Sequence, residues 1–151
     1  MSERRRLVIG VGNTDRGDDG AGRVVAQRLR SRNAGALEVR ECTGEAAALM
    51  DAWTGFDEVV LVDACRGDGE PGSIHRFAPD DLDRLSAARP RRYASTHGFG
   101  VVEAVALARA LGTLPSGLVV YAIEGGRFRD GAGLSPAVDH AVQELVALLA
   151  R

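Results

Sequence analysis

The 151-residue chain has a formal net charge of −2; 45% of its residues are hydrophobic and 26% are charged. This composition is typical of a soluble globular protein, and the length suits one domain spanning residues 1–151. A charge so close to zero excludes a general electrostatic attraction to nucleic acid or to an anionic membrane.

The sequence also lacks the patterns of membrane and secreted proteins. No apolar run approaches the roughly 18 residues that a membrane span needs, and the run after Arg4–Arg6 ends at Gly10, which is too early for a signal peptide. The cysteines Cys42 and Cys65 are too few for a disulfide scaffold. We therefore expect a cytoplasmic protein with reduced thiols and, because no exposed apolar stripe stands out, a monomer.

The first part of the chain alternates between strand and helix patterns. Leu7–Val11 is a short apolar run that ends among glycines, and Val59–Val62 is apolar on both faces, as a central parallel strand requires. In chain order, the expected elements are a strand at 7–11, a helix at 20–30, a strand at 37–41, a short helix at 45–53 and a strand at 58–64.

The second part begins with a turn-rich loop at 66–72 and a short strand, Ser73–Phe77. The connection is too short for a parallel crossover, so this strand is expected to run antiparallel to the strand at 58–64. Then follow a helical turn or two at 79–85, an irregular and mobile segment at 87–95, a helix at 98–111, a strand at 118–123, a glycine-rich loop at 125–133 and a final helix. Ser135 as N-cap and Pro136 at the first turn mark the start of that helix.

This alternation predicts a three-layer α/β/α sandwich with a mostly parallel five-stranded sheet, one strand of which is antiparallel. The carboxyl ends of parallel strands share one edge of a sheet, and open α/β sheets bind their ligands at that edge.

Three polar residues lie where strands give way to loops or helices. Asp19 follows the first strand, Asp63 ends the strand at 58–64, and His97 comes directly before the helix at 98–111. We expect their side chains to converge, because these points lie on the same edge of the sheet. Two carboxylates and an imidazole form a mixed oxygen and nitrogen ligand set that leaves coordination positions open for a substrate group. The dipole of the following helix favours neutral His97, which is the form that binds metal.

Each of these residues also has a structural interpretation. Asp19 or its neighbour Asp18 is suited to capping the helix at 20–30. Asp63 is suited to accepting hydrogen bonds from loop amides, and a lone histidine before a helix is more often structural than catalytic.

Other chemistry-bearing residues are weaker candidates. Cys65 has no histidine next to it in sequence to activate a thiolate, and a buried free cysteine behaves as a small apolar residue. His75 in the strand at 73–77 and His140 in the last helix fit surface or packing positions better than ligand positions.

The first loop also resembles part of a dinucleotide-binding motif. Gly10 and Gly12 match its first two glycines, but Asp15 occupies the third position, and the acid pair would repel a pyrophosphate at the helix start. Glu41, at the end of the second strand, occupies the place of the ribose-binding acid. A nucleotide-binding module therefore stays open as an alternative.

Several segments, taken in order, resemble the hydrogenase maturation proteases, the endopeptidases of nickel–iron hydrogenase assembly. They are Gly10-Val11-Gly12-Asn13, Asp18-Asp19-Gly20-Ala21-Gly22, Leu61-Val62-Asp63-Ala64, Pro71-Gly72, Ser95-Thr96-His97 and Leu134-Ser135-Pro136. The resemblance implies an endopeptidase that removes a C-terminal extension from a nickel-loaded hydrogenase large-subunit precursor. It also implies that Asp19, Asp63 and His97 are the catalytic residues that contact nickel, that the nickel belongs to the substrate, and that the protease holds no permanent metal.

The chain departs from the family pattern at two places. Many members carry Glu at the position of Asp19, and many have an Asp-Gly-Gly-Thr loop where this chain reads Glu41-Cys42-Thr43-Gly44. Gly12 and Asn13 are candidates for substrate contacts. Two alternatives stay open: a metal-dependent peptidase or amidase that acts on another substrate through the same three residues, and a non-catalytic module that binds nickel or a nucleotide.

Overall fold

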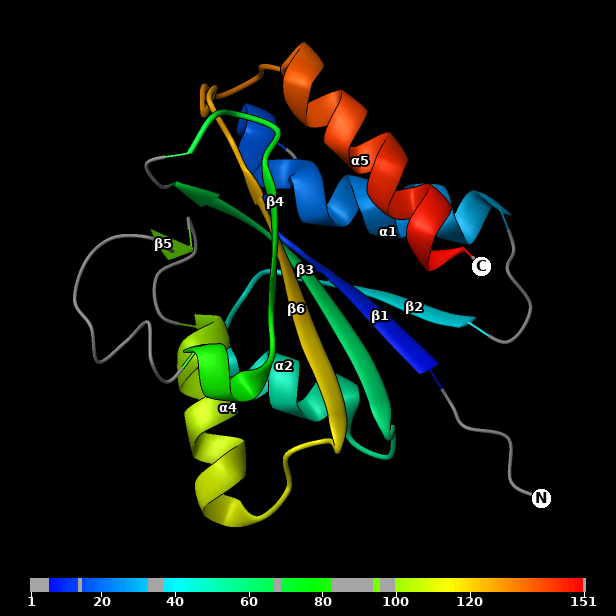
Figure 1. Cartoon of the computed structure of the whole chain (residues 1–151), viewed down its shortest axis with the longest axis vertical. Helices are drawn as coiled ribbons and strands as arrows, with labels where there is room; N and C mark the ends of the chain where they lie inside the picture. Colours follow the sequence, from blue (N-terminus) through cyan, green and yellow to red (C-terminus); the bar gives the residue numbers. More distant parts are fainter. Residues whose placement is uncertain are drawn as a thin grey trace.

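A twisted, mostly parallel sheet runs through the middle of the molecule (Figure 1). The computed structural model describes residues 6–13, 15–32, 37–66, 69–82, 94–95 and 100–150. Five strands follow the order β2-β1-β3-β6-β4; they are β1 (Arg6–Val11), β2 (Leu37–Cys42), β3 (Glu58–Arg66), β4 (Ile74–Phe77) and β6 (Gly117–Glu124). β4 is antiparallel to β6, whereas β1, β2, β3 and β6 run parallel to one another. The two-residue strand β5 (Ala94–Ser95) pairs antiparallel with the end of β3.

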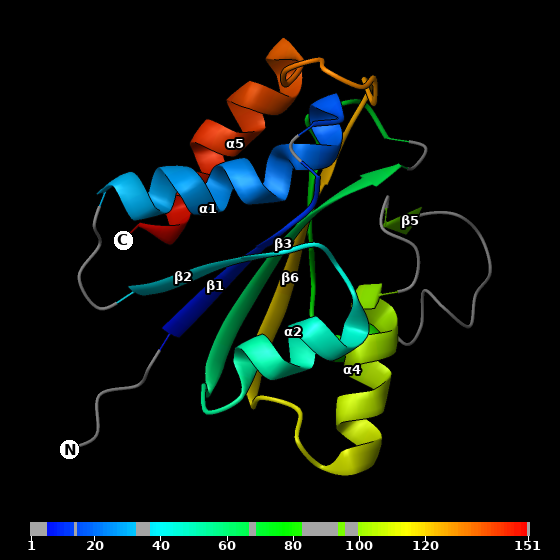
Figure 2. The same ribbon diagram turned by 180° about the vertical axis from the view of Figure 1, so that it is seen from behind.

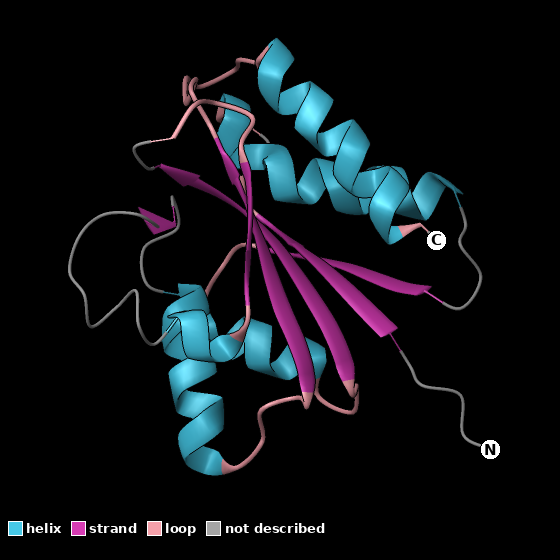
Figure 3. Ribbon diagram, viewed as in Figure 1, coloured by secondary structure: helices cyan, strands magenta, loops and turns pink. Residues whose placement is uncertain are grey.

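Helices cover both faces of the sheet, which confirms the three-layer sandwich (Figures 2 and 3). α1 (Ala21–Arg32) and α5 (Pro136–Leu149) lie on one face, and α2 (Ala46–Trp53) and α4 (Gly100–Leu111) lie on the other. None of the helices in the described part of the chain has both the length and the apolar character of a membrane span.

Alternation along the central strands builds two separate apolar cores. In β3, Val59 and Leu61 belong to the core beneath α2 and α4, and Val60 and Val62 belong to the core beneath α1 and α5. The predicted stripe of α5 fills the second core with four buried side chains, Val138, Val142, Leu145 and Leu149. Successive strand residues point to opposite faces, so the part of a central strand that lies between the two cores must be apolar on both faces.

The predicted strands and helices are confirmed with shifts of one or two residues at their ends. Residues 79–82 form the start of the expected helical turn, while 83–85, the expected segment 87–93 and the helix start 98–99 lie outside the described residues. Residues 94–95 form β5 rather than an irregular segment. They do so because the extended end of β3 at Cys65 and Arg66 offers them a partner.

The predicted antiparallel direction of the strand at 73–77 relative to β3 is confirmed, and its hydrogen-bonded neighbour is β6. β4 pairs with β6, through His75 opposite Ala122 and Phe77 opposite Val120. Its direction is opposite to β3, as expected, but β6 already occupies that side of β3 along eight residues. The short hairpin-like return therefore reaches the outer side of β6, which is the next open edge.

Helix α1 lies in close contact with the sheet because glycine occupies both sides of the contact. A Cβ atom at Gly22 would lie 2.2 Å from the carbonyl oxygen of Val62, and one at Gly10 would lie 2.3 Å from the carbonyl oxygen of Gly22. Carbon and oxygen atoms cannot approach so closely, so any larger residue would push the helix away from β1 and β3. This contact fixes the beginning of α1 over the central pair of strands.

We expect Gly22→Ala to lower the free energy of unfolding by about 3 kcal/mol, because overpacking outweighs the gain of about 1 kcal/mol in helix propensity. Urea unfolding followed by circular dichroism measures the change. Gly133→Ala is the matched control, since a Cβ at Gly133 meets nothing within 4 Å, and its cost should stay within about 0.5 kcal/mol. Equal stability of the two variants would contradict the close contact.

Candidate active site at the carboxyl edge of the sheet

The 3-10 helix η1 (Gly17–Gly20) links β1 to α1 and carries the acid pair. Asp18 is fully buried and accepts four hydrogen bonds: from the backbone N–H groups of Gly126, Arg127 and Ser135 at 2.8 Å each, and from the Ser135 hydroxyl at 2.9 Å. Asp18 therefore fastens the glycine-rich loop to the end of β1, and the helix-capping interpretation is wrong for this residue. Ser135 holds the N-cap position of α5, but its hydroxyl bonds to Asp18 instead of capping the helix.

Asp19, the next residue, is 4% exposed and lies beside the end of β1. Its carbonyl oxygen accepts a hydrogen bond from the backbone N–H of Asn13 at 3.3 Å, and a Cβ at Gly12 would lie 2.3 Å from that same oxygen. η1 also packs against β3. The glycine at position 12 thus lets the chain fold back so that Asp19 lies at the edge shared by β1 and β3.

Asp63 lies within β3 and has no exposed surface. Its Oδ1 accepts a hydrogen bond from the backbone N–H of Ala64 at 2.9 Å. It follows Val59 and Leu61 at the two-residue spacing of one strand face, so its side chain is on the α2/α4 side of the sheet. The strand continues to Arg66, two residues beyond the predicted end.

The third predicted ligand, His97, lies outside the described residues. Two described neighbours bracket it in sequence. Ser95 pairs with Cys65, two residues beyond Asp63, and Gly100 begins α4, where a Cβ would collide with the carbonyl oxygen of Gly44. Within the part of the chain that the structure describes, no three His, Cys, Asp or Glu side chains form a metal-holding group. The structure therefore brings Asp19 and Asp63 to one edge, and the participation of His97 stays a prediction.

Two predicted substrate contacts, Gly12 and Asn13, lie in the loop after β1. The N–H of Gly12 donates to the carbonyl oxygen of Cys42 at 3.1 Å, and the N–H of Asn13 donates to Asp19. Both backbone donors are thus used inside the protein. The Asn13 side chain is exposed, and its Oδ1 accepts a hydrogen bond from the Asp15 N–H at 2.9 Å. A role in substrate contact for these two residues stays a prediction.

Cys65 lies between two buried acids and is itself fully buried. Burial, followed by the negative charges of Glu124 and Asp63, raises the pKa of its thiol to about 12. A thiolate is the nucleophilic form of cysteine, so Cys65 is unsuited to covalent catalysis near neutral pH.

Because its pKa is raised, Cys65 should stay protonated in the folded protein at pH 8. We expect iodoacetamide at this pH to leave Cys65 unmodified in the folded protein and to modify it once the chain is unfolded in urea. Peptide mass spectrometry reads out the site of modification. Rapid modification of Cys65 in the folded protein would contradict the burial and charge described above.

Glu41, the candidate ribose-binding acid, is already engaged by helix α1. Its carboxylate accepts hydrogen bonds from Arg23 at 3.0 Å and from Gln27 and Arg30 at 2.9 Å each. Burial raises the pKa of Glu41. The hydrogen bonds from Gln27, Arg30 and Arg23 and the charge of Arg23 have a larger, opposite effect, so the pKa lies below its usual value. Glu41 therefore holds α1 against β2, which counts against the dinucleotide alternative.

One buried acid at this edge is absent from the sequence-based candidates. Glu124 ends β6 with its side chain 3% exposed, and its Oε1 lies 2.7 Å from Nε2 of His75, whose side chain is 36% exposed. His75 is therefore the partner of a buried carboxylate rather than a simple surface residue. The sequence could have indicated Glu124 as a buried acid, because Glu124 follows the apolar run at 118–123 just as Asp63 follows Val59–Val62.

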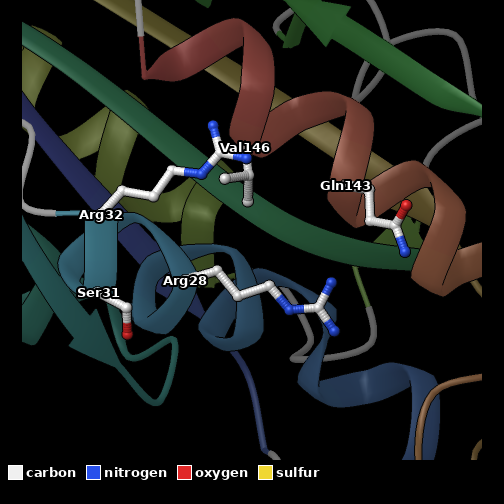
Figure 4. Close-up of a pocket in the computed structure, with 5 residues that line it drawn as sticks. All are labelled: Arg28, Ser31, Arg32, Gln143 and Val146. Atoms are coloured by element: carbon white, nitrogen blue, oxygen red, sulfur yellow. The ribbon is translucent and has the colours of Figure 1, made fainter.

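Two pockets elsewhere on the surface contain none of these acids. One lies between α1 and α5 and is lined by Arg28, Ser31, Arg32, Gln143 and Val146 (Figure 4). Arg28 already pairs with Asp139 of α5 at 2.7 Å, so its charge is used to join the two helices. The other is lined by residues of α2, the end of α4 and the loops that precede β3 and β6, which places it at the opposite end of the sheet.

The strand order defines an α/β protein that carries two buried acids, Asp19 and Asp63, at the carboxyl edge of its sheet. The family model for HycI, hydrogenase maturation protease, matches residues 25–151. The chain therefore belongs to the hydrogenase maturation protease family and is an endopeptidase. The matched range includes Asp63 and His97, whereas Asp19 precedes it.

Comparisons with individual proteins of known sequence or structure support this family membership. The chain is 26% identical to the hydrogenase expression/formation protein HupD of Thiocapsa roseopersicina, over 95% of this chain and 69% of that protein. Among solved structures, the nickel–iron hydrogenase maturation protease HycI of Thermococcus kodakarensis is 26% identical, with a TM-score of 0.76 over 97% of this chain and 90% of that one. The maturating endopeptidase HybD of Escherichia coli, 19% identical, shares the fold, with a TM-score of 0.76 over 96% of this chain and 89% of that one.

Proposed function

We propose that the protein cleaves the C-terminal extension from the nickel-loaded large-subunit precursor of a nickel–iron hydrogenase. The observation that carries the proposal is the pair Asp19 and Asp63. Both are buried carboxylates at the carboxyl ends of the paired strands β1 and β3, in a chain of the hydrogenase maturation protease family. Carboxylate oxygens on adjacent strands are suited to grip a divalent metal from one side.

His97 completes the proposed set as a nitrogen ligand. The pairing of Ser95 with Cys65 supports this role, because it holds the chain two residues before His97 beside the strand that carries Asp63. Asp19, Asp63 and His97 would leave other coordination positions of the metal to the precursor's own ligands. The nickel therefore belongs to the substrate, and no permanently bound metal is expected in the protease.

This arrangement would let the protease distinguish nickel-loaded precursor from nickel-free precursor. A precursor without nickel would lack the group that the three ligands bind, so its cleavage site would not be positioned in the active site. When nickel is present, it would fix the neighbouring peptide and add its positive charge near the scissile carbonyl group. Hydrolysis also requires a group that accepts a proton from water.

The experiment compares nickel-loaded and nickel-free precursor, each incubated with the purified protein and analysed by intact mass. We expect only the loaded precursor to lose a C-terminal fragment. Equal cleavage of both forms would overturn nickel recognition. Cleavage of unrelated peptides with added nickel would overturn the substrate assignment and favour a general metal-dependent peptidase.

A further inference from the structure

On the α2/α4 face of the sheet, residues that lie opposite one another on β3, β6 and β4 form rows across the strands. The row next to the last apolar row contains the polar residues Asp63 and His75. The last apolar row consists of Leu61, Val120 and Phe77, which lie opposite one another on β3, β6 and β4. Two residues further along, Ala122 lies opposite Asp63 on one side and opposite His75 on the other. Residues directly opposite in a sheet point to the same face, so Asp63 and His75 share this face.

Asp63 and His75 flank Ala122 on one face of the sheet. Adjacent strands lie about 4.8 Å apart, which puts the Cα atoms of Asp63 and His75 about 10 Å apart. A precursor whose metal is bound by Asp63 would bring the neighbouring peptide bond toward this face of the sheet. The imidazole of His75 would then approach the peptide from the side opposite to Asp63.

Glu124 orients the imidazole. An ionised carboxylate only accepts hydrogen bonds, so when Glu124 is ionised and the ring is neutral, the 2.7 Å contact places the ring proton on Nε2 and leaves Nδ1 as an acceptor. Nδ1 makes no hydrogen bond to any described residue. The ring stacks on Phe77 with its centroid 6.1 Å away, and its partial exposure gives water access.

The surroundings of Glu124 are built to hold its carboxylate in place. The backbone of Glu124 is tied on both sides, since its N–H donates to Ser73 at 2.9 Å and its carbonyl oxygen accepts from Gly72 at 2.8 Å. A Cβ at position 69 would lie 2.4 Å from Oε1, so a side chain there would displace the carboxylate from its present position. A buried acid that orients a half-exposed imidazole is the arrangement of a base and its positioning residue.

We propose that His75 is the general base of the hydrolysis and that Glu124 is its positioning residue. This inference rests on the function proposed above. Nδ1 takes a proton from water while the water oxygen bonds to the scissile carbonyl carbon, and Glu124 stabilises the resulting imidazolium. The same proton then passes to the leaving amine as the C–N bond breaks, so the products are a new terminal carboxyl group, which loses its remaining proton to solvent, and a free peptide. His75 returns to its neutral form.

The test measures two quantities on nickel-loaded precursor: the single-turnover cleavage rate and the nickel-dependent binding of precursor. His75→Gln keeps a side-chain donor for Glu124 but lacks a base, and should lower the cleavage rate by about 100-fold or more while leaving binding unchanged. Glu124→Gln should lower the rate by at least about tenfold with binding also unchanged. Added imidazole should restore part of the rate in His75→Ala, which a purely structural role of His75 would not allow.

The matched control is His140→Ala, which breaks a similar pair with Glu144 at 3.0 Å on the exposed side of α5. This variant should cleave at the unmodified rate. If the unmodified protein cleaves only the loaded precursor and His75→Gln cleaves within about threefold of it, His75 is not the base and the proposed function stands. If the unmodified protein cleaves loaded and nickel-free precursor equally, the proposed function fails and this inference falls with it.

Discussion

Replacing Asp63 with asparagine is expected to lower the cleavage rate of nickel-loaded precursor by at least about 100-fold and to remove its nickel-dependent binding. Asparagine has the shape of aspartate, and its amide oxygen can still accept the hydrogen bond from the Ala64 N–H. The fold should therefore survive while the negative charge that binds the metal is lost. Combined loss of binding and cleavage separates Asp63 from His75, whose replacement should affect cleavage alone.

The control for Asp63 is the same change at an exposed aspartate. Asp51 lies on the solvent side of α2, and Asp51→Asn should cleave like the unmodified protein. Thermal unfolding of both variants shows whether either is folded at the assay temperature. Folded Asp63→Asn protein that binds and cleaves loaded precursor normally would rule out Asp63 as a nickel ligand.

The largest expected effect on stability belongs to the neighbouring acid pair, at Asp18. Asp18→Ala would leave three backbone N–H groups and one hydroxyl group without their buried acceptor. Buried donors that lose a charged partner are costly, so we expect the free energy of unfolding to fall by about 4 kcal/mol. For a domain of this size, the melting temperature should fall by about 10 °C. Calorimetry or urea unfolding measures the loss.

Ser135→Ala provides a graded comparison for Asp18, because it removes only the hydroxyl donor among the four. Its expected cost is about 1 kcal/mol, since the other three bonds to Asp18 remain. Should Asp18→Ala also cost no more than about 1 kcal/mol, the loop would be held by other contacts and the described role of Asp18 would be wrong.

The sequence predicts those parts of the molecule that depend on local pattern. The run Val59–Val62 favours a strand buried on both faces, and the spacing of apolar residues at 138–149 favours a buried helix face; the structure confirms both. The placement of Asp19 and Asp63 near the carboxyl ends of the paired strands β1 and β3 follows from the same reasoning, because parallel strands end at one edge. Family resemblance added the expected activity, which the pattern of strands and helices does not specify.

Long-range contacts account for what the sequence does not predict. Asp18 accepts hydrogen bonds from residues 108–117 positions away, so no local motif distinguishes its role from that of a helix cap. The pairing of β4 with β6 depends on which edge is free once the parallel strands are in place. The row of Asp63 and His75 follows from that pairing, and so it became visible only in the assembled sheet.

Nickel-dependent cleavage would require contact between the precursor's nickel and three side chains of the protease. The most direct test is nickel-edge X-ray absorption on loaded precursor, alone and rapidly frozen with the protease before cleavage. We predict that the complex gains oxygen and imidazole nitrogen scatterers around nickel, and that the nitrogen signal disappears with His97→Ala. A nickel spectrum that is the same with and without the bound protease would contradict the account.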